Sequence, residues 1–434
     1  MPCRNGGLGA VRSIGAFSSV YASSSKPSHN CMLEQQYNYK KGGIAQRISR
    51  LALFSTISTN KKDNQHEGKI RLSACSRLGL SPYSNRFHAP IVYHENYSFE
   101  GWPQHFTFPM DKFSKLSECL VTNCHQTNPE ASTLSRPLVR SYEDFFRPLD
   151  LVDAPLDLWF SHPTGPIDPD FFQAFIEGRL TKEECRRIGF REQTSRPELI
   201  ERTVLEVLGT ILACQLAIQF GIASNAAGGT HHATPTGGAG YTILNDLAIA
   251  ANYLTNPFVH QGDVPTNIKK VLVIDCDVHQ GDGTAKFGES GIIGSDRMAT
   301  LSIHCKDNYP SLKAHSTYDI GLAKNLKDDD YMNHLKASVT TALEEQSPDF
   351  VLYDAGVDIY EHDTLGRLKV SLDGIRRRDR WVLDSCVTRG IPIAAVIGGG
   401  YDKDVDALAR RHAIVHEECA YQWRKHTMWR RLEK

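Results

Sequence analysis

The sequence shows no excess of charge of either sign. Its 49 lysine and arginine residues nearly balance its 50 aspartate and glutamate residues, so the formal net charge is −1. Nucleic acids attract basic surfaces, and this balance provides no global attraction of that kind. We therefore expect no direct binding to nucleic acid. The sequence also has no run approaching the roughly 18 apolar residues of a membrane-spanning helix, and we expect a soluble protein without a membrane partner.

Paired cysteines are absent as well. The chain has 11 cysteines, but none of them show the C-x-x-C spacing that is typical of metal or redox sites. Cys276 lies inside an apolar segment. Both features favour reduced, mostly buried thiols over a disulfide framework. The hydrophobic content of 41% is sufficient for a sizeable core.

Acidic residues are nearly missing from the N-terminal part of the chain. The first 62 residues contain nine lysines or arginines, several serine clusters and a single acidic residue, Glu34. An arginine- and serine-rich, acid-poor N-terminus is typical of an organelle transit peptide. We therefore expect residues 1–68 to form an extension directed to a plastid or mitochondrion, and residues 69–434 to form one large domain. A disordered extension without an address is the alternative.

Strand-like and helix-like segments alternate along the rest of the chain. Apolar runs at residues 271–274, 350–352 and 391–397 are typical of buried strands. Helical periodicity predicts helices over residues 199–220, 242–254, 330–346 and 373–388. This alternation predicts an α/β fold with a mostly parallel central sheet and helices on both faces.

A basic run lies on the last of these predicted helices. It consists of Arg376, Arg377, Arg378 and Arg380. The usual meaning of such a run is a solvated helix face, and we adopt that interpretation over phosphate or nucleic-acid binding.

The segment VLVIDCDVHQGDGT, residues 271–284, ends a predicted strand in metal-binding side chains. Asp275, Asp277 and His279 are spaced two residues apart, which places all three on one face of a strand. Ligands in open α/β sheets bind at the carboxyl ends of the strands, where these residues lie. Taken alone, so short a motif also fits an ordinary strand followed by an acidic turn.

Three further segments supply groups that could meet this set. Asp358 follows the strand at 350–352, Tyr401 follows three consecutive glycines, and the adjacent His231 and His232 lie in a glycine-rich turn. Each has an ordinary explanation on its own, as a helix cap, a turn or a core histidine. Together, two imidazoles, an Asp/Asp/His/Asp set and a phenol favour a metal-assisted hydrolase.

These motifs resemble the zinc-dependent histone deacetylases. The segments GGTHHATPTGGAGYTILND, VLVIDCDVHQGDGT, LYDAGVD and IGGGYD keep the order and spacing of that family between residues 199 and 422. A weaker segment, IVYHENYSFEGWPQHFTFPMDKF, suggests the class IV branch or a related plant and bacterial branch. The resemblance implies a single arginase/deacetylase-like α/β domain.

The resemblance also implies a metal site. Asp277, His279 and Asp358 match the family's three metal ligands, which leave a coordination position open for water and substrate. Two carboxylates and one imidazole suit Zn²⁺ first, while Fe²⁺, Co²⁺ or Mn²⁺ stay open as alternatives.

By the same resemblance, His231 and His232 match the family's proton-transfer pair. Asp275 would hydrogen-bond His231 and Asp282 would hydrogen-bond His232, which fixes tautomer and basicity. His232 is implied as the general base, while the division of the acid role between the two histidines stays open. Tyr401 is implied as the donor to the oxyanion.

Substrate-contacting and potassium-binding residues follow from the resemblance too. Gly240 and Tyr241 match one wall of the acyl-lysine tunnel, and Tyr309 is a candidate for the opposite wall. A structural potassium site would take oxygens from Asp275, His279 and Ser302.

The chain departs from the family pattern at several positions. Thr107 stands where an arginine is expected, which puts in doubt a cationic group near the inner acetate-release channel. The rim aspartate that would grip the substrate backbone is Asp168 or Asp170, or is missing. Gln280 stands where many relatives have a second histidine, and we expect this change to be tolerated.

Three functional hypotheses remain. The first is a deacetylase of acyl-lysine in histones or other proteins, with repressor-complex proteins as possible partners. The family resemblance places such an enzyme in the nucleus or cytosol, as the alternative to the organelle that the N-terminus suggests. The second is a deacetylase of small acetylated amines such as polyamines, and the third is a non-catalytic acyl-lysine-binding module. A ureohydrolase is disfavoured, because it needs a second set of metal ligands and none is evident in the sequence.

Overall fold

The computed structural model describes residues 88–122, 137–148, 154–261, 264–265 and 267–432. The predicted extension, residues 1–68, lies outside these ranges. The described residues contain one seven-stranded sheet in the order β1-β2-β7-β6-β3-β4-β5, and every pairing in it is parallel. The strands are β1 (Ile91–Val92), β2 (Ile222–Asn225), β3 (Val271–Asp275), β4 (Met298–Cys305), β5 (Tyr318–Leu322), β6 (Phe350–Asp354) and β7 (Ile393–Val396).

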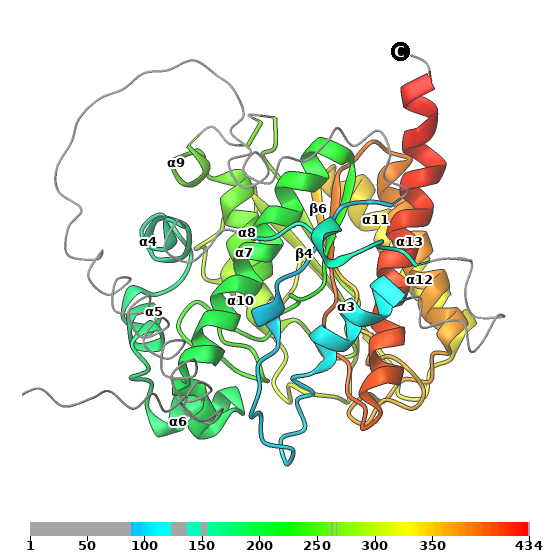
Figure 1. Cartoon of the computed structure of the whole chain (residues 1–434). Helices are drawn as coiled ribbons and strands as arrows, with labels where there is room; N and C mark the ends of the chain where they lie inside the picture. The colour runs from blue at the N-terminus through cyan, green and yellow to red at the C-terminus, as the bar shows by residue number, and fades with distance from the viewer. Residues whose placement is uncertain (1–87, 123–136, 149–153, 262–263, 266, 433–434) are drawn as a thin grey trace, which may run out of the picture. The chain divides into compact units, whose positions relative to one another are not determined.

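Helices cover both faces of this sheet (Figure 1). The longer ones are α3 (Lys112–Thr122), α5 (Pro169–Ile176), α6 (Lys182–Ile188), α7 (Pro197–Phe220), α8 (Asp246–Thr255), α10 (Asp282–Glu289), α11 (Asp328–Gln346), α12 (Leu372–Val387) and α13 (Val405–Leu432). Helices α7 and α8 contact the strands from one side, and α11, α12 and α13 contact them from the other. The predicted α/β fold is therefore confirmed.

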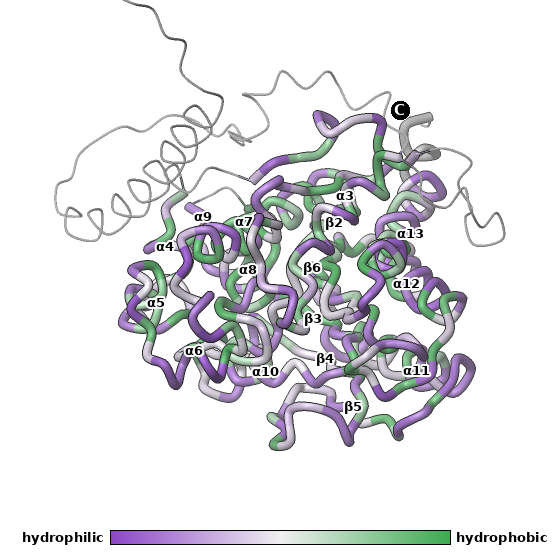
Figure 2. Tube along the Cα trace, turned by 60° about the horizontal axis from the view of Figure 1, so that its bottom comes forward, coloured by the Kyte–Doolittle hydropathy of each residue, from purple (hydrophilic) through white to green (hydrophobic). Residues whose placement is uncertain are grey.

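The central strands form the core between these layers. All residues of β2, β3, β6 and β7 are buried. Figure 2 shows hydrophobic stretches in the interior, around β2 and β3, while much of the outer tube is hydrophilic. Strands buried on both faces require continuous apolar runs, which explains the runs seen in the sequence. Any polar group at the end of such a strand is consequently held in a dry, rigid setting.

Helix α7 is long and apolar enough to meet the length and composition criteria for a membrane-spanning helix. Contrary to the expectation from the sequence, one 18-residue window of α7 reaches the length and hydropathy of a spanning helix, but 78% of that window is buried inside the protein. The helix begins with Pro197 in its first turn and ends at Gly221, whose φ is 86°. It packs against β2 and β7 as a core helix.

The other predicted helices are present with shifted ends. Helix α11 starts two residues before the predicted segment, and α12 is displaced by one residue. Helix α8 begins only at Asp246, because the side chain of Asn245 caps it by accepting a hydrogen bond from Ala248 N. Residues 242–245 therefore belong to the preceding turn.

The interpretation of the basic run as a solvated face is wrong for Arg378 and Arg376. Arg378 is fully buried beneath the sheet edge, and Arg376 pairs with Glu417 and Glu418 of α13. A helix turns 100° per residue, so four arginines within five positions cannot all face solvent on a packed helix.

Candidate metal centre

Three buried side chains converge at the carboxyl ends of β3 and β6. Asp277 and His279 follow β3, and Asp358 follows β6, which pairs with β3 along its length. Nδ1 of His279 lies 3.0 Å from Asp277 Oδ1 and 3.1 Å from Asp358 Oδ2. The three residues each offer one atom to a common point, so they could hold a metal ion.

The spacing of these atoms fits a divalent ion. Ligands about 2.0–2.2 Å from a tetrahedral metal lie about 3.3–3.6 Å apart, only slightly more than the distances seen here. The second oxygens are also held: Gly399 N donates to Asp277 Oδ2 over 2.8 Å, and Val278 N donates to Asp358 Oδ1 over 2.8 Å. Both carboxylates are therefore oriented by the backbone.

The two adjacent histidines lie beside this group with different partners. Nδ1 of His231 is 2.8 Å from Asp275 Oδ2, and Nδ1 of His232 is 2.6 Å from Asp282 Oδ1, so both expected pairings are present. Their rings lie 4.2 Å apart. Each histidine thus has its Nδ1 occupied and leaves Nε2 for chemistry.

The environment separates the two histidines in charge. Burial alone would lower the pKa of His231, but Asp275 and Asp277 outweigh it and raise this pKa well above the usual histidine value. Burial and the neighbouring charge of His231 lower the pKa of His232 to about 4. At neutral pH the metal-free site therefore holds a charged His231 beside a neutral His232, the second of which can accept a proton.

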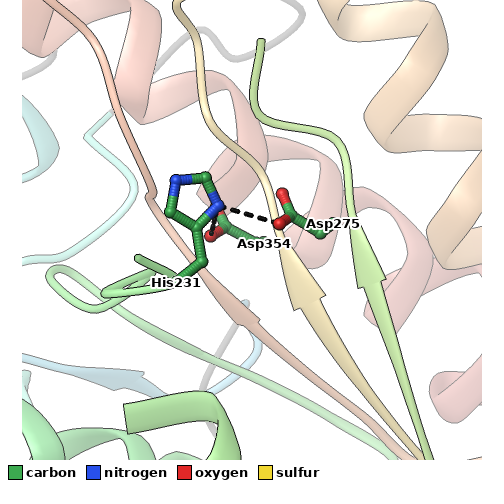
Figure 3. A group of neighbouring side chains, drawn as sticks. All are labelled: His231, Asp275 and Asp354. Atoms are coloured by element: carbon green, nitrogen blue, oxygen red, sulfur yellow. Dashed lines mark hydrogen bonds and ion pairs between the residues drawn. The ribbon is translucent and has the colours of Figure 1, made fainter. Parts of the chain in front are cut away.

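Asp354 is a third partner of His231 that the sequence analysis did not identify. It ends β6 directly opposite Asp275 in the parallel register. Its Oδ2 lies 3.8 Å from His231 Nδ1, so one ring nitrogen faces two carboxylates from neighbouring strands (Figure 3). This group could also hold a cation. No second set of candidate ligands was evident in the sequence, because only the pairing of two distant strands brings Asp275 and Asp354 together beside His231.

The carboxyl group of Asp354 is enclosed and incompletely bonded. It is fully buried, and its Oδ2 has no hydrogen-bond partner among the described residues. A Cβ at Gly398 would lie 2.0 Å from Oδ1 and one at Gly229 would lie 2.8 Å from Oδ2. Burial and the neighbouring Asp275 raise the pKa of Asp354 well above its usual value.

Tyr401 is anchored at the same edge. Its backbone N donates to Asp363 Oδ2 over 2.7 Å, directly after the glycines that follow β7. The Tyr401 ring lies 6.4 Å from that of His279. Burial raises the pKa of Tyr401 well above its usual value. The hydroxyl therefore keeps its proton and can donate a hydrogen bond toward the metal group.

Aromatic rings enclose the approach to the site. Tyr241 stacks on Phe190 at 5.6 Å and lies 6.1 Å from Tyr401. Tyr309 sits edge-on to His232 at 4.8 Å and is 44% exposed. A Cβ at Gly240 would lie 3.1 Å from the Tyr309 ring, so this glycine lets the two sides approach.

The inner end of the site is cationic despite Thr107, which is exposed. Lys112 and Arg202 line the cavity that also contains His231, His232 and Tyr401. Lys112 is buried, and its Nζ donates to Gly398 O over 3.1 Å. Burial and the charge of Arg202 lower the pKa of Lys112 to about 8. The doubt raised by Thr107 is therefore resolved by a lysine five residues later.

The residues expected at the potassium site lie close to β3. Ser302 of β4 pairs in register with Asp275, and its Oγ lies 3.1 Å from His304 Nδ1. The side chain of His279 faces Asp277 and Asp358 instead. Only the backbone oxygen of His279 is thus left for a potassium ion.

The remaining departures from the family pattern have clear structural places. Asp168 caps α5 by accepting from Phe171 N over 2.9 Å, while Asp170 lies exposed in the first turn of that helix. Gln280 is buried, and its side chain bonds Ala314 and Asp319 rather than the metal group. Gln280 therefore fastens the loop that carries Tyr309.

Comparisons with known proteins agree with this geometry. The histone deacetylase domain model matches residues 172–417. An uncharacterized protein of Picosynechococcus sp. is 38% identical over 75% of this chain and 97% of its own length. Histone deacetylase 2 of Arabidopsis thaliana is 32% identical over 47% of this chain, and the chain spans 52% of that protein.

Two more distant matches are a bacterial sequence relative and a solved structure. The acetoin utilization protein AcuC of Staphylococcus aureus is 27% identical over 52% of this chain and 59% of its own length. The crystal structure of the HDA15 HD domain aligns with a TM-score of 0.57 at 17% identity, covering 77% of this chain and 90% of that one. The domain model and the closely matching full-length relative together show that the chain belongs to the histone deacetylase domain family.

Proposed function

We propose that this protein is a metal-dependent amidohydrolase that removes acetyl or other acyl groups from lysine side chains of histones or other proteins. The observation that carries the proposal is the pair of adjacent histidines, each with its Nδ1 bonded to a carboxylate, beside a three-residue group that could hold a metal ion. Zn²⁺ is the proposed ion, held by Asp277, His279 and Asp358. When bound, it would supply Lewis acidity toward the amide carbonyl and the attacking water.

The chain's own groups would carry the proton transfers. Neutral His232, with Nδ1 bonded to Asp282, would take the proton of the attacking water at Nε2. Charged His231 would stabilise the negative charge that develops, since its Nδ1 is held by Asp275. Tyr401 would donate its hydroxyl to the amide oxygen as that oxygen becomes an oxyanion. The proton on His232 would then pass to the leaving amine.

The enclosure supports a slender substrate. Tyr241 and Tyr309 border an approach that suits the four-carbon stem of lysine, which packs well against aromatic rings. The cationic Lys112 at the inner end would accommodate the carboxylate that is released. A protein substrate would keep its backbone outside these rings.

The test is release of acetate from an acetyl-lysine peptide by the full-length chain. We expect release that is lost with a chelator, restored by Zn²⁺ and absent in His232→Ala. A metal-loaded wild-type protein that binds the peptide without hydrolysing it would instead support an acyl-lysine-binding module. Faster turnover of an acetylated polyamine than of any peptide would move the substrate to small amines.

A further inference from the structure

Arg378 of α12 is a buried cation beneath the metal group that the proposed reaction does not use. Its side chain has no exposed surface. An arginine is almost never fully buried unless it is paired, because removing its charge from water is costly. The hydrogen-bond partners of Arg378 therefore indicate the role of this buried side chain.

These partners are the chain segments that carry the metal ligands. Nη1 donates to Gly356 O over 2.5 Å and to Cys276 O over 3.3 Å, and Nη2 donates to Ala355 O over 3.0 Å. Cys276 lies between Asp275 and Asp277 in the sequence. Residues 355–356 lie between Asp354 and Asp358. One guanidinium thus ties together the two segments that supply all three proposed ligands.

Regular strand pairing does not extend to these three carbonyls, although Cys276 N still donates to Asp354 O over 3.0 Å. The ladder between β3 and β6 ends with the pair Asp275 and Asp354, so the carbonyls that follow lose their regular pairing. A buried carbonyl without a partner is unfavourable. The planar fork of arginine can serve several acceptors at fixed angles, which a lysine ammonium cannot reproduce.

The guanidinium is itself held in place. Its Nε donates to Asp379 Oδ1 over 2.8 Å, and the Tyr353 hydroxyl donates to the same oxygen over 2.6 Å. Asp379 and Tyr353 are both fully buried. The orientation of the guanidinium is therefore fixed at Nε as well as at its two Nη atoms.

We propose that Arg378 is a positioning residue that sets the spacing between Asp277, His279 and Asp358 by clamping the two chain segments behind them. This inference rests on the metal site proposed above. It concerns the affinity for the ion rather than any proton transfer. Groups that orient metal ligands from behind typically change metal affinity about 10–100-fold when they are altered.

The experiment is a Zn²⁺ titration of the full-length protein against a competing chelator, with the melting temperature of the metal-free protein measured alongside. We expect Arg378→Lys to weaken Zn²⁺ binding about 10–100-fold. The matched control is Arg377→Lys on the same helix, which is exposed and pairs with Asp329 and Asp373 at the surface. It should bind Zn²⁺ like the wild type.

Further outcomes decide between a positioning and a merely structural role. Wild-type Zn²⁺ affinity in Arg378→Lys, even with a lower melting temperature, would overturn the proposal. If Arg378→Lys does not fold, Tyr353→Phe serves as the second variant. It removes one hydrogen bond to Asp379 and should weaken Zn²⁺ binding less than the loss of the guanidinium would. An unchanged Zn²⁺ affinity in Tyr353→Phe would also overturn the proposal. A wild-type protein that binds no Zn²⁺ would reject the metal site itself, which is a separate result.

Discussion

The backbone amide of Gly399 donates to Asp277 Oδ2 over 2.8 Å. A Cβ at this position would lie 2.5 Å from an oxygen of each carboxylate. Gly399 therefore orients Asp277 through its backbone amide, and its lack of a side chain leaves room for the carboxylates of Asp277 and Asp358.

Replacing Gly399 by alanine is expected to abolish metal binding. The added methyl would push apart two carboxylates that must face one ion, whereas the fold could absorb a shift in this loop. Metal content after dialysis against Zn²⁺ is the measurement. Gly288→Ala in α10 is the matched control, because nothing lies within 4 Å of a Cβ there. Full Zn²⁺ occupancy in Gly399→Ala would contradict the proposed ligand set.

Removing the Tyr401 hydroxyl is expected to slow hydrolysis without preventing binding. Loss of one oxyanion donor typically lowers kcat about 10²–10³-fold. Tyr401→Phe should therefore lower kcat by that factor and leave KM nearly unchanged, as measured with an acetyl-lysine peptide. Tyr318→Phe, which only removes a surface contact with Glu345 and Gln346, serves as the control. An equal kcat for Tyr401→Phe and wild type would remove Tyr401 from the mechanism.

The two carboxylates that face His231 are expected to differ sharply on substitution. Burial and the neighbouring Asp275 raise the pKa of Asp354 and favour its neutral form, whose shape asparagine keeps, so Asp354→Asn should leave kcat within about threefold of wild type. Asp275→Asn removes the charged partner at 2.8 Å and should lower kcat about 10–100-fold. The ratio of the two kcat values is the readout. A large loss in Asp354→Asn would show that Asp354 carries charge or a cation.

Stability is expected to fall in mild acid because of His416 in α13. It is buried with Nδ1 at 2.8 Å from Ser224 Oγ, and burial lowers its pKa to about 3. Above about pH 6.5 His416 is neutral in both the folded and the unfolded state, so it adds no pH dependence to the free energy of unfolding. Below that value the unfolded chain takes up the proton first, so the free energy of unfolding decreases by about 1.4 kcal/mol per pH unit until pH nears 3.

Urea unfolding at pH 7.5 and pH 5 measures this effect. His416→Gln removes the titrating group and keeps a side chain that can bond Ser224. The wild type should lose about 2 kcal/mol more than this variant between the two pH values. Equal losses would mean that His416 is already protonated in the folded protein.

Much of the site was evident from the sequence because its residues sit in short motifs at strand ends. Asp277 and His279 share one segment, and the alternation of strands and helices brings Asp358 to the same edge. Lys112 and Asp354 lie inside segments that carry the family resemblance but received no role from the sequence, and Arg378 was interpreted as part of a solvated helix face. A cation on a helix reads as a surface residue unless its inward face is known.

The sequence by itself determined the α/β class, the three buried strands β3, β6 and β7, and the groups that carry the proposed chemistry, because hydrophobic periodicity, apolar runs and turn residues are local properties. The tertiary structure decided which distant groups meet. Asp354 faces His231 only because β6 pairs with β3 in a fixed register, and Arg378 is buried only because α12 packs that side of the helix against the sheet. Such contacts depend on packing between segments far apart in the chain, which no local pattern encodes.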